Sequence, residues 1–165
     1  MYTLAQLYQD PYIQLFKISN TTGKWEALNL NELETYIFVY SDSSFYKERF
    51  KEKLNNIVPI DIKPPKYAIN TSILTGKCLV EPRFKGKQKL YETYNARIIK
   101  KDLDPIQDKE IIRQHELIHM EPNWNLTSRL IYFYEMNVDV DLVKLYEFYP
   151  DEFSKYLSIF QDRFK

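Results

Sequence analysis

The sequence has little of what several common classes of protein require. It contains one cysteine, so the chain cannot form an internal disulfide, and burial has to hold its fold together. Its 23 acidic residues balance its 23 basic ones, so no overall charge favours binding to nucleic acid or to an anionic membrane. No run approaches the roughly 20 apolar residues of a membrane span, and no signal-peptide pattern opens the sequence. We therefore expect a soluble, cytoplasmic protein.

Glycine is scarce too, with 3 residues, whereas 14 tyrosines and 10 phenylalanines indicate an aromatic core. The 165 residues suffice for a single domain, which we expect to cover residues 1–165. Apolar spacing and turn signals predict strands at 11–18, 25–30 and 36–40, and helices at 105–120, 126–136, 142–149 and from 153 onward. The expected fold class is α+β, with antiparallel or mixed strands packed around the helix at 105–120 and additional helices toward the C-terminus.

The helix predicted over 105–120 carries the pattern His-Glu-x-x-His at residues 115–119. In a helix, a spacing of four places His115 and His119 on one face, one turn apart, where both imidazoles can bind one metal ion. The ion would lower the pKa of a bound water toward ~7, and Glu116 could take its proton and return it to a leaving group. The pattern therefore predicts a metal-dependent hydrolase, against the alternative of two ordinary half-buried histidines.

A catalytic metal site of this kind needs a third protein ligand, and the sequence offers two candidates. Cys78 is one, in the segment Gly76–Pro82. The other is Glu135, sixteen positions after His119 on a later predicted helix, which is typical of glutamate-ligated zinc proteases. The residues alone leave both candidates open.

Several segments resemble motifs of the peptide deformylase family. That family's third motif, in which glutamine directly precedes His-Glu-x-x-His, is similar to Gln114–His119. Its second motif, Glu-Gly-Cys-Leu-Ser followed one residue later by proline, resembles Cys78–Pro82, and its Ile-Asn-Pro-x-Ile strand resembles Ile69–Ile73. For the glutamine of the first motif, the nearest match is Gln6, with Gln9 as the alternative.

The resemblance implies an enzyme that removes the formyl group from the N-terminal formyl-methionine of nascent polypeptides. The implied cofactor is one divalent metal ion, Fe²⁺ or Zn²⁺, with Ni²⁺ or Co²⁺ as alternatives. The implied site has three metal ligands, one proton carrier, two oxyanion donors and two pocket residues. The metal ligands are Cys78, His115 and His119, and the proton carrier is Glu116. The oxyanion donors are the backbone N–H of Leu79 and the amide of Gln6. The pocket residues are Ile111 and Ile112.

The partners that the resemblance implies are formylated nascent peptides, with docking on the ribosome left open and no direct contact with nucleic acid or membrane. Two alternatives to the deformylase stay open. One is a zinc protease with Glu135 as the third ligand. The other is a deformylase-like protein that has lost turnover and acts by binding.

Overall fold

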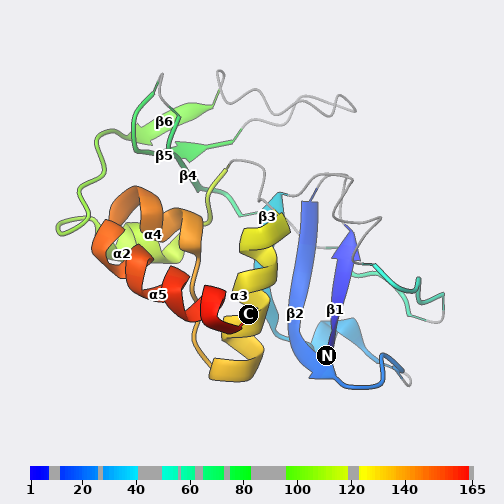
Figure 1. Cartoon of the computed structure of the whole chain (residues 1–165). Coiled ribbons are helices and arrows are strands. Elements are labelled where there is room, and N and C mark those ends of the chain that lie inside the picture. Colours follow the sequence, from blue (N-terminus) through cyan, green and yellow to red (C-terminus); the bar gives the residue numbers. More distant parts are fainter. Residues whose placement is uncertain are drawn as a thin grey trace.

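The computed structural model describes residues 1–7, 12–25, 28–40, 50–55, 57–61, 65–72, 75–82, 96–118 and 123–163. Within them the chain forms six strands, a short 3-10 helix η1 (Leu30–Glu32) and four α-helices, so the expected α+β class is confirmed (Figure 1). None of the helices in these ranges has the length and apolar character needed to cross a bilayer.

The first sheet is antiparallel, in the order β1 (Tyr2–Leu7), β2 (Tyr12–Asn20) and β3 (Thr35–Tyr40). Side chains alternate between its two faces, and one face packs against α3 (Asn123–Met136) through a buried cluster. That cluster consists of Ile13, Leu15, Ile37, Val39 and Leu126. The predicted strands at 11–18 and 36–40 are thus confirmed over the described residues, whereas Trp25 and Leu28–Leu30 are not in a strand.

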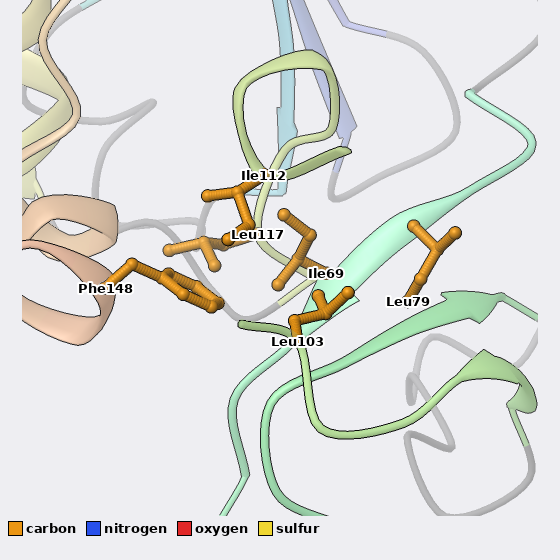
Figure 2. Close-up of a cluster of buried hydrophobic side chains, with 6 residues drawn as sticks. All are labelled: Ile69, Leu79, Leu103, Ile112, Leu117 and Phe148. Atoms are coloured by element: carbon orange, nitrogen blue, oxygen red, sulfur yellow. The ribbon is translucent and has the colours of Figure 1, made fainter. Parts of the chain in front are cut away.

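The second sheet is also antiparallel, in the order β4 (Ala68–Asn70), β5 (Cys78–Glu81) and β6 (Arg97–Lys100). On the side of β4 away from β5, Ile69 forms a parallel bridge with Leu117. A cluster of six buried residues covers this junction: Ile69, Leu79, Leu103, Ile112, Leu117 and Phe148 (Figure 2). The segment around Leu117 therefore extends the sheet beyond β4.

The C-terminal helices pack on the face of α3 away from the first sheet. Helix α4 (Leu142–Phe148) begins at the capping residue Asp141, and α5 (Pro150–Arg163) follows it directly. The predicted apolar face of the last helix is confirmed, because its residues pack against the buried cluster of Tyr132, Val140 and Leu142. Those residues are Phe153, Tyr156, Leu157 and Phe160.

The helix predicted over 105–120 is shorter than the sequence pattern indicates. Asp104 caps a turn at residues 105–108, where the sequence predicts the helix to begin, since its side chain accepts hydrogen bonds from the backbone N–H groups of Ile106 and Gln107, both at 2.8 Å. The α-helical part, α2, is limited to Lys109–Gln114, and His115 is already extended, with φ −117° and ψ 135°. The expectation that the central helix carries the His-Glu-x-x-His pattern is therefore wrong for His115 to Ile118.

Candidate functional site

Residues 115–118 leave the helix because their backbone bonds to β4 instead. The N–H of Ile69 donates to the carbonyl of Glu116 at 2.9 Å, and the N–H of Ile118 donates to the carbonyl of Ile69 at 2.8 Å. Successive side chains then point to opposite sides, as in a strand. Leu117 joins the cluster around Ile69, and Ile118 packs with Cys78.

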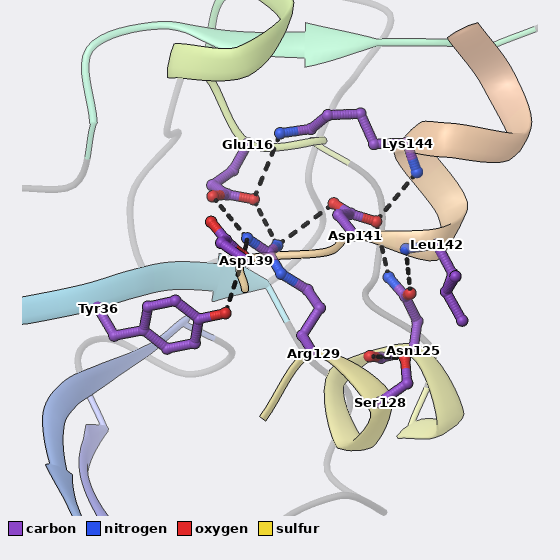
Figure 3. A network of polar contacts seen from close by, with 9 residues as sticks. All are labelled: Tyr36, Glu116, Asn125, Ser128, Arg129, Asp139, Asp141, Leu142 and Lys144. Atoms are coloured by element: carbon purple, nitrogen blue, oxygen red, sulfur yellow. Dashed lines mark hydrogen bonds and ion pairs between the residues drawn. The ribbon is translucent and has the colours of Figure 1, made fainter. Parts of the chain in front are cut away.

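The side chain of Glu116 is held by Arg129 of α3. Nη1 of Arg129 donates to Oε2 of Glu116 at 2.7 Å, and Nη2 donates to Oε1 at 3.2 Å, so both carboxylate oxygens are engaged (Figure 3). Lys144 lies further off, with Nζ 3.9 Å from Oε2. The side chain of Arg129 is only 1% exposed, and that of Glu116 is 24% exposed. A bidentate pair of this kind fixes the relative orientation of the two side chains and also strengthens their electrostatic attraction.

This pairing sets the ionisation of Glu116. Burial alone would raise the pKa of the carboxyl, but the charges of Arg129 and Lys144, together with the hydrogen bonds from Arg129, lower the pKa to about 2. The carboxylate is therefore ionised at neutral pH. A base with so low a pKa is a weak proton acceptor, since general bases work best with a pKa near the working pH.

Arg129 also binds two carboxylates that follow α3. Its guanidinium donates to Oδ1 of Asp139 at 3.2 Å and to Oδ2 of Asp141 at 3.3 Å. The hydroxyl of Tyr36, on β3, donates to the same Asp139 oxygen at 2.8 Å. Arg129 thus connects the first sheet, α3, the start of α4 and the segment that extends the second sheet (Figure 3).

A buried amide holds Asp141 in place. Asn125 is fully buried; its side-chain N–H donates to Asp141 at 2.9 Å, and its side-chain oxygen accepts from the backbone N–H of Leu142, also at 2.9 Å. Sequence reasoning missed this network. Its signal was the spacing of Asn125, Ser128 and Arg129 at i, i+3 and i+4, which places three polar side chains on one face of a helix. That face is buried here.

Two of the implied metal ligands, Cys78 and His115, lie within the described residues, and they pack against different neighbours. Cys78 is fully buried beside Ile118, whereas the ring of His115 lies on the other side of the segment, edge-on to Tyr67 with ring centres 6.1 Å apart. His119 itself is outside the described residues. Within those residues, no three His, Cys, Asp or Glu side chains form a group that could hold a metal ion.

His115 is half-buried, and its ring stays uncharged more readily than a free imidazole. Burial lowers its pKa first, and the positive charge of Lys144 lowers it further, against a smaller opposite effect from Glu116. A neutral imidazole can bind a metal ion, but it packs equally well against an aromatic ring such as Tyr67.

The other implied site residues lie in two places. Leu79 and Ile112 belong to the cluster beside β4, where Ile112 is fully buried (Figure 2). Ile111 is partly buried and packs against that cluster. Gln6 is in β1 of the other sheet, and its amide both donates to and accepts from the backbone of Ile60, at 2.6 and 3.1 Å. Glu135 is exposed on α3, and Gln9 is outside the described residues.

These features define an α+β protein whose two described sheets are joined through a buried ion-pair network. Residues 1–153 match the family model described as a domain of unknown function, DUF8309, and the chain belongs to that family. No curated protein matches the chain. No solved structure matches it either.

Proposed function

We propose that this protein acts by binding a partner, without hydrolytic turnover, and that its His-Glu-x-x-His segment is a structural joint. The observation that supports this is the bidentate pairing of Glu116 with the buried Arg129. A carboxylate whose pKa is about 2 takes a proton from water poorly, because a general base works best with a pKa near the working pH. Both oxygens of Glu116 already accept hydrogen bonds, and withdrawing them would leave a guanidinium short of a partner in the interior, which is costly.

The joint also gives a structural role to each of residues 115–118, the part of the pattern that the structure describes. The carbonyl of Glu116 and the N–H of Ile118 bond to β4, Leu117 fills the cluster beside Ile69, and His115 packs on Tyr67. These contacts account for the described part of the segment without catalysis. The proposed function is therefore that of a binding module whose fold depends on this segment.

A second candidate is the deformylase-type metallohydrolase, with Cys78, His115 and His119 as ligands of Fe²⁺ or Zn²⁺. One observation favours it: β4 lies between the strand that contains Cys78 and the segment that contains the histidines, and Cys78 packs against Ile118, the residue before His119. Two segments far apart in sequence thus lie near each other, as that enzyme would require.

Metal analysis combined with a formate-release assay separates the two candidates. The purified chain would be incubated anaerobically with Fe²⁺ or Zn²⁺ and then assayed on formyl-Met-Ala-Ser. We expect no stoichiometric metal and no formate, either from the wild type or from Glu116→Gln. About one bound ion per chain, with formate release that is lost in Glu116→Gln but kept in the control Glu110→Gln, would reject the binding module in favour of the hydrolase.

A further inference from the structure

Strand β6 is the outermost strand of the second sheet (Figure 1). It pairs with β5, and no other strand of the described residues pairs with it. All four of its residues are exposed, whereas most residues of β4 and β5 are buried. Such an edge presents N–H and C=O groups on which a further strand can form.

Two isoleucines occupy the middle of β6, and neither is buried by the rest of the chain. Ile98 is 37% exposed and Ile99 is 41% exposed. The pairing of β6 with β5 shifts register between Ile98 and Lys100, so Ile99 lies at an irregularity of the strand, and both isoleucines offer apolar surface that a neighbouring strand would cover. Aromatic side chains, on which nucleic-acid bases stack, do not occur in the strand, and this favours a protein partner over a nucleic acid.

Basic side chains lie beside these isoleucines, and their positive charges are only partly neutralised. The side chain of Arg97 is 67% exposed and lies 3.8 Å from Glu81, a long contact for an ion pair. Lys100 pairs with Asp108, and Lys101 is exposed just past the strand. An antiparallel pair of two β6 strands would bring the basic residues of one copy close to those of the other, and like charges across a strand pair are destabilising. A second copy of this chain is therefore a poor occupant.

We propose that β6 binds an extended, acidic segment of a partner protein by strand addition. The partner's backbone would pair with the outer edge of β6, its apolar residues would cover Ile98 and Ile99, and its carboxylates would lie near Arg97 and Lys101. This inference rests on the proposed function, since it names the class of partner that the binding module accepts.

The test uses the full-length ¹⁵N-labelled chain and two synthetic probes, acetyl-Glu-Val-Thr-Val-Glu-amide and the same peptide with lysines in place of the glutamates. We expect the acidic probe to shift amide signals of residues 97–100, to slow hydrogen exchange there and to bind at least tenfold more tightly than the basic probe. Arg97→Gln/Lys101→Gln should remove most of this preference. The matched control Lys51→Gln/Lys53→Gln changes the same charge at exposed positions outside the sheet and should keep it.

Other outcomes would overturn the inference. Equal binding of both probes, or shifts confined to other residues, would show that β6 is not an acidic docking edge. Tighter binding of a 20-nucleotide oligo(dT) than of the acidic probe would assign the basic residues to nucleic acid. A spectrum of the Arg97→Gln/Lys101→Gln variant recorded without probe shows whether it folds, and Arg97→Gln alone serves if it does not. None of these results affects formate release, so failure here is distinct from failure of the proposed function.

Discussion

Arg129 holds both carboxylate oxygens of Glu116, at 2.7 and 3.2 Å, across 13 positions of sequence. The pair replaces what the sequence pattern predicts for Glu116, which is an approach to metal-bound water from a helix. It also joins α3 to the segment that extends the second sheet. The following predictions test this pair and the segment that carries it.

Glu116→Gln should destabilise the protein by about 2 kcal/mol, because Arg129 would lose its closest charged partner while remaining buried. The loss stays moderate since Asp139 and Asp141 still bind the guanidinium. Urea denaturation of both proteins measures the difference. The matched control is Glu110→Gln, an exposed position on α2, which should change stability by less than about 0.5 kcal/mol. Equal stability of the two variants would show that the pair contributes nothing.

The same pair predicts a dependence of stability on pH. The pKa of Glu116 is about 2 in the folded protein against 4.5 without its partners, so its contribution is complete above pH ~5 and is lost as the pH falls toward 2. Over that range, the free energy of unfolding should drop by up to about 3 kcal/mol more in the wild type than in Glu116→Gln. Urea titrations at several pH values measure this, and parallel curves for the two proteins would contradict it.

Lys144→Met should raise the pKa of His115 toward its usual value, because the lysine charge disfavours the imidazolium. Burial remains in the variant, so the pKa should still lie below 6.5. NMR titration of the imidazole ¹H–¹³C signals measures the change, and His115→Gln identifies which signal belongs to this residue. Lys155→Met, an exposed change on α5, should leave the titration unaltered. The opposite shift in Lys144→Met would show that this lysine does not act on His115.

The conformation of residues 115–118 is directly measurable in solution. Their backbone chemical shifts should be those of extended chain, and the amides of Ile69 and Ile118 should exchange slowly because each donates to a carbonyl across the bridge. Helical shifts continuing from Gln114 through Ile118 would contradict the structure and restore the helix that the sequence pattern predicts. In that case His115 and His119 would share a helix face, and the metal site would regain its geometric basis.

Local sequence patterns predicted those parts of the fold that depend on neighbouring residues. The last helix turns one apolar face to the core, because a spacing of three and four residues places side chains on the same face of a helix. The residues on that face are Phe153, Tyr156, Leu157 and Phe160. Asp104 caps the turn before α2 because a carboxylate there satisfies free backbone N–H groups. Both features depend on residues near one another in the sequence.

The candidate site depended on contacts between distant residues, and local patterns could not predict them. His115-Glu116-Leu117 has ordinary helix-forming character, but hydrogen bonds to Ile69 and the pairing with Arg129 favour the extended form. Tertiary contacts often override a propensity that amounts to tenths of a kcal/mol per residue. The amide of Gln6 likewise forms hydrogen bonds with the backbone of Ile60, a contact that no motif could indicate.

The position of Arg129 has a consequence for how the protein denatures. Its carboxylate partner Asp139 also accepts from Tyr36, 103 positions earlier, while Glu116 ties the same guanidinium to the strand-like extension of β4. Separation of either sheet from α3 would therefore strip partners from a charge buried in the interior, a penalty far larger than the loss of a surface contact. We expect the two sheets to melt together in one cooperative transition, so that calorimetric and van't Hoff enthalpies agree.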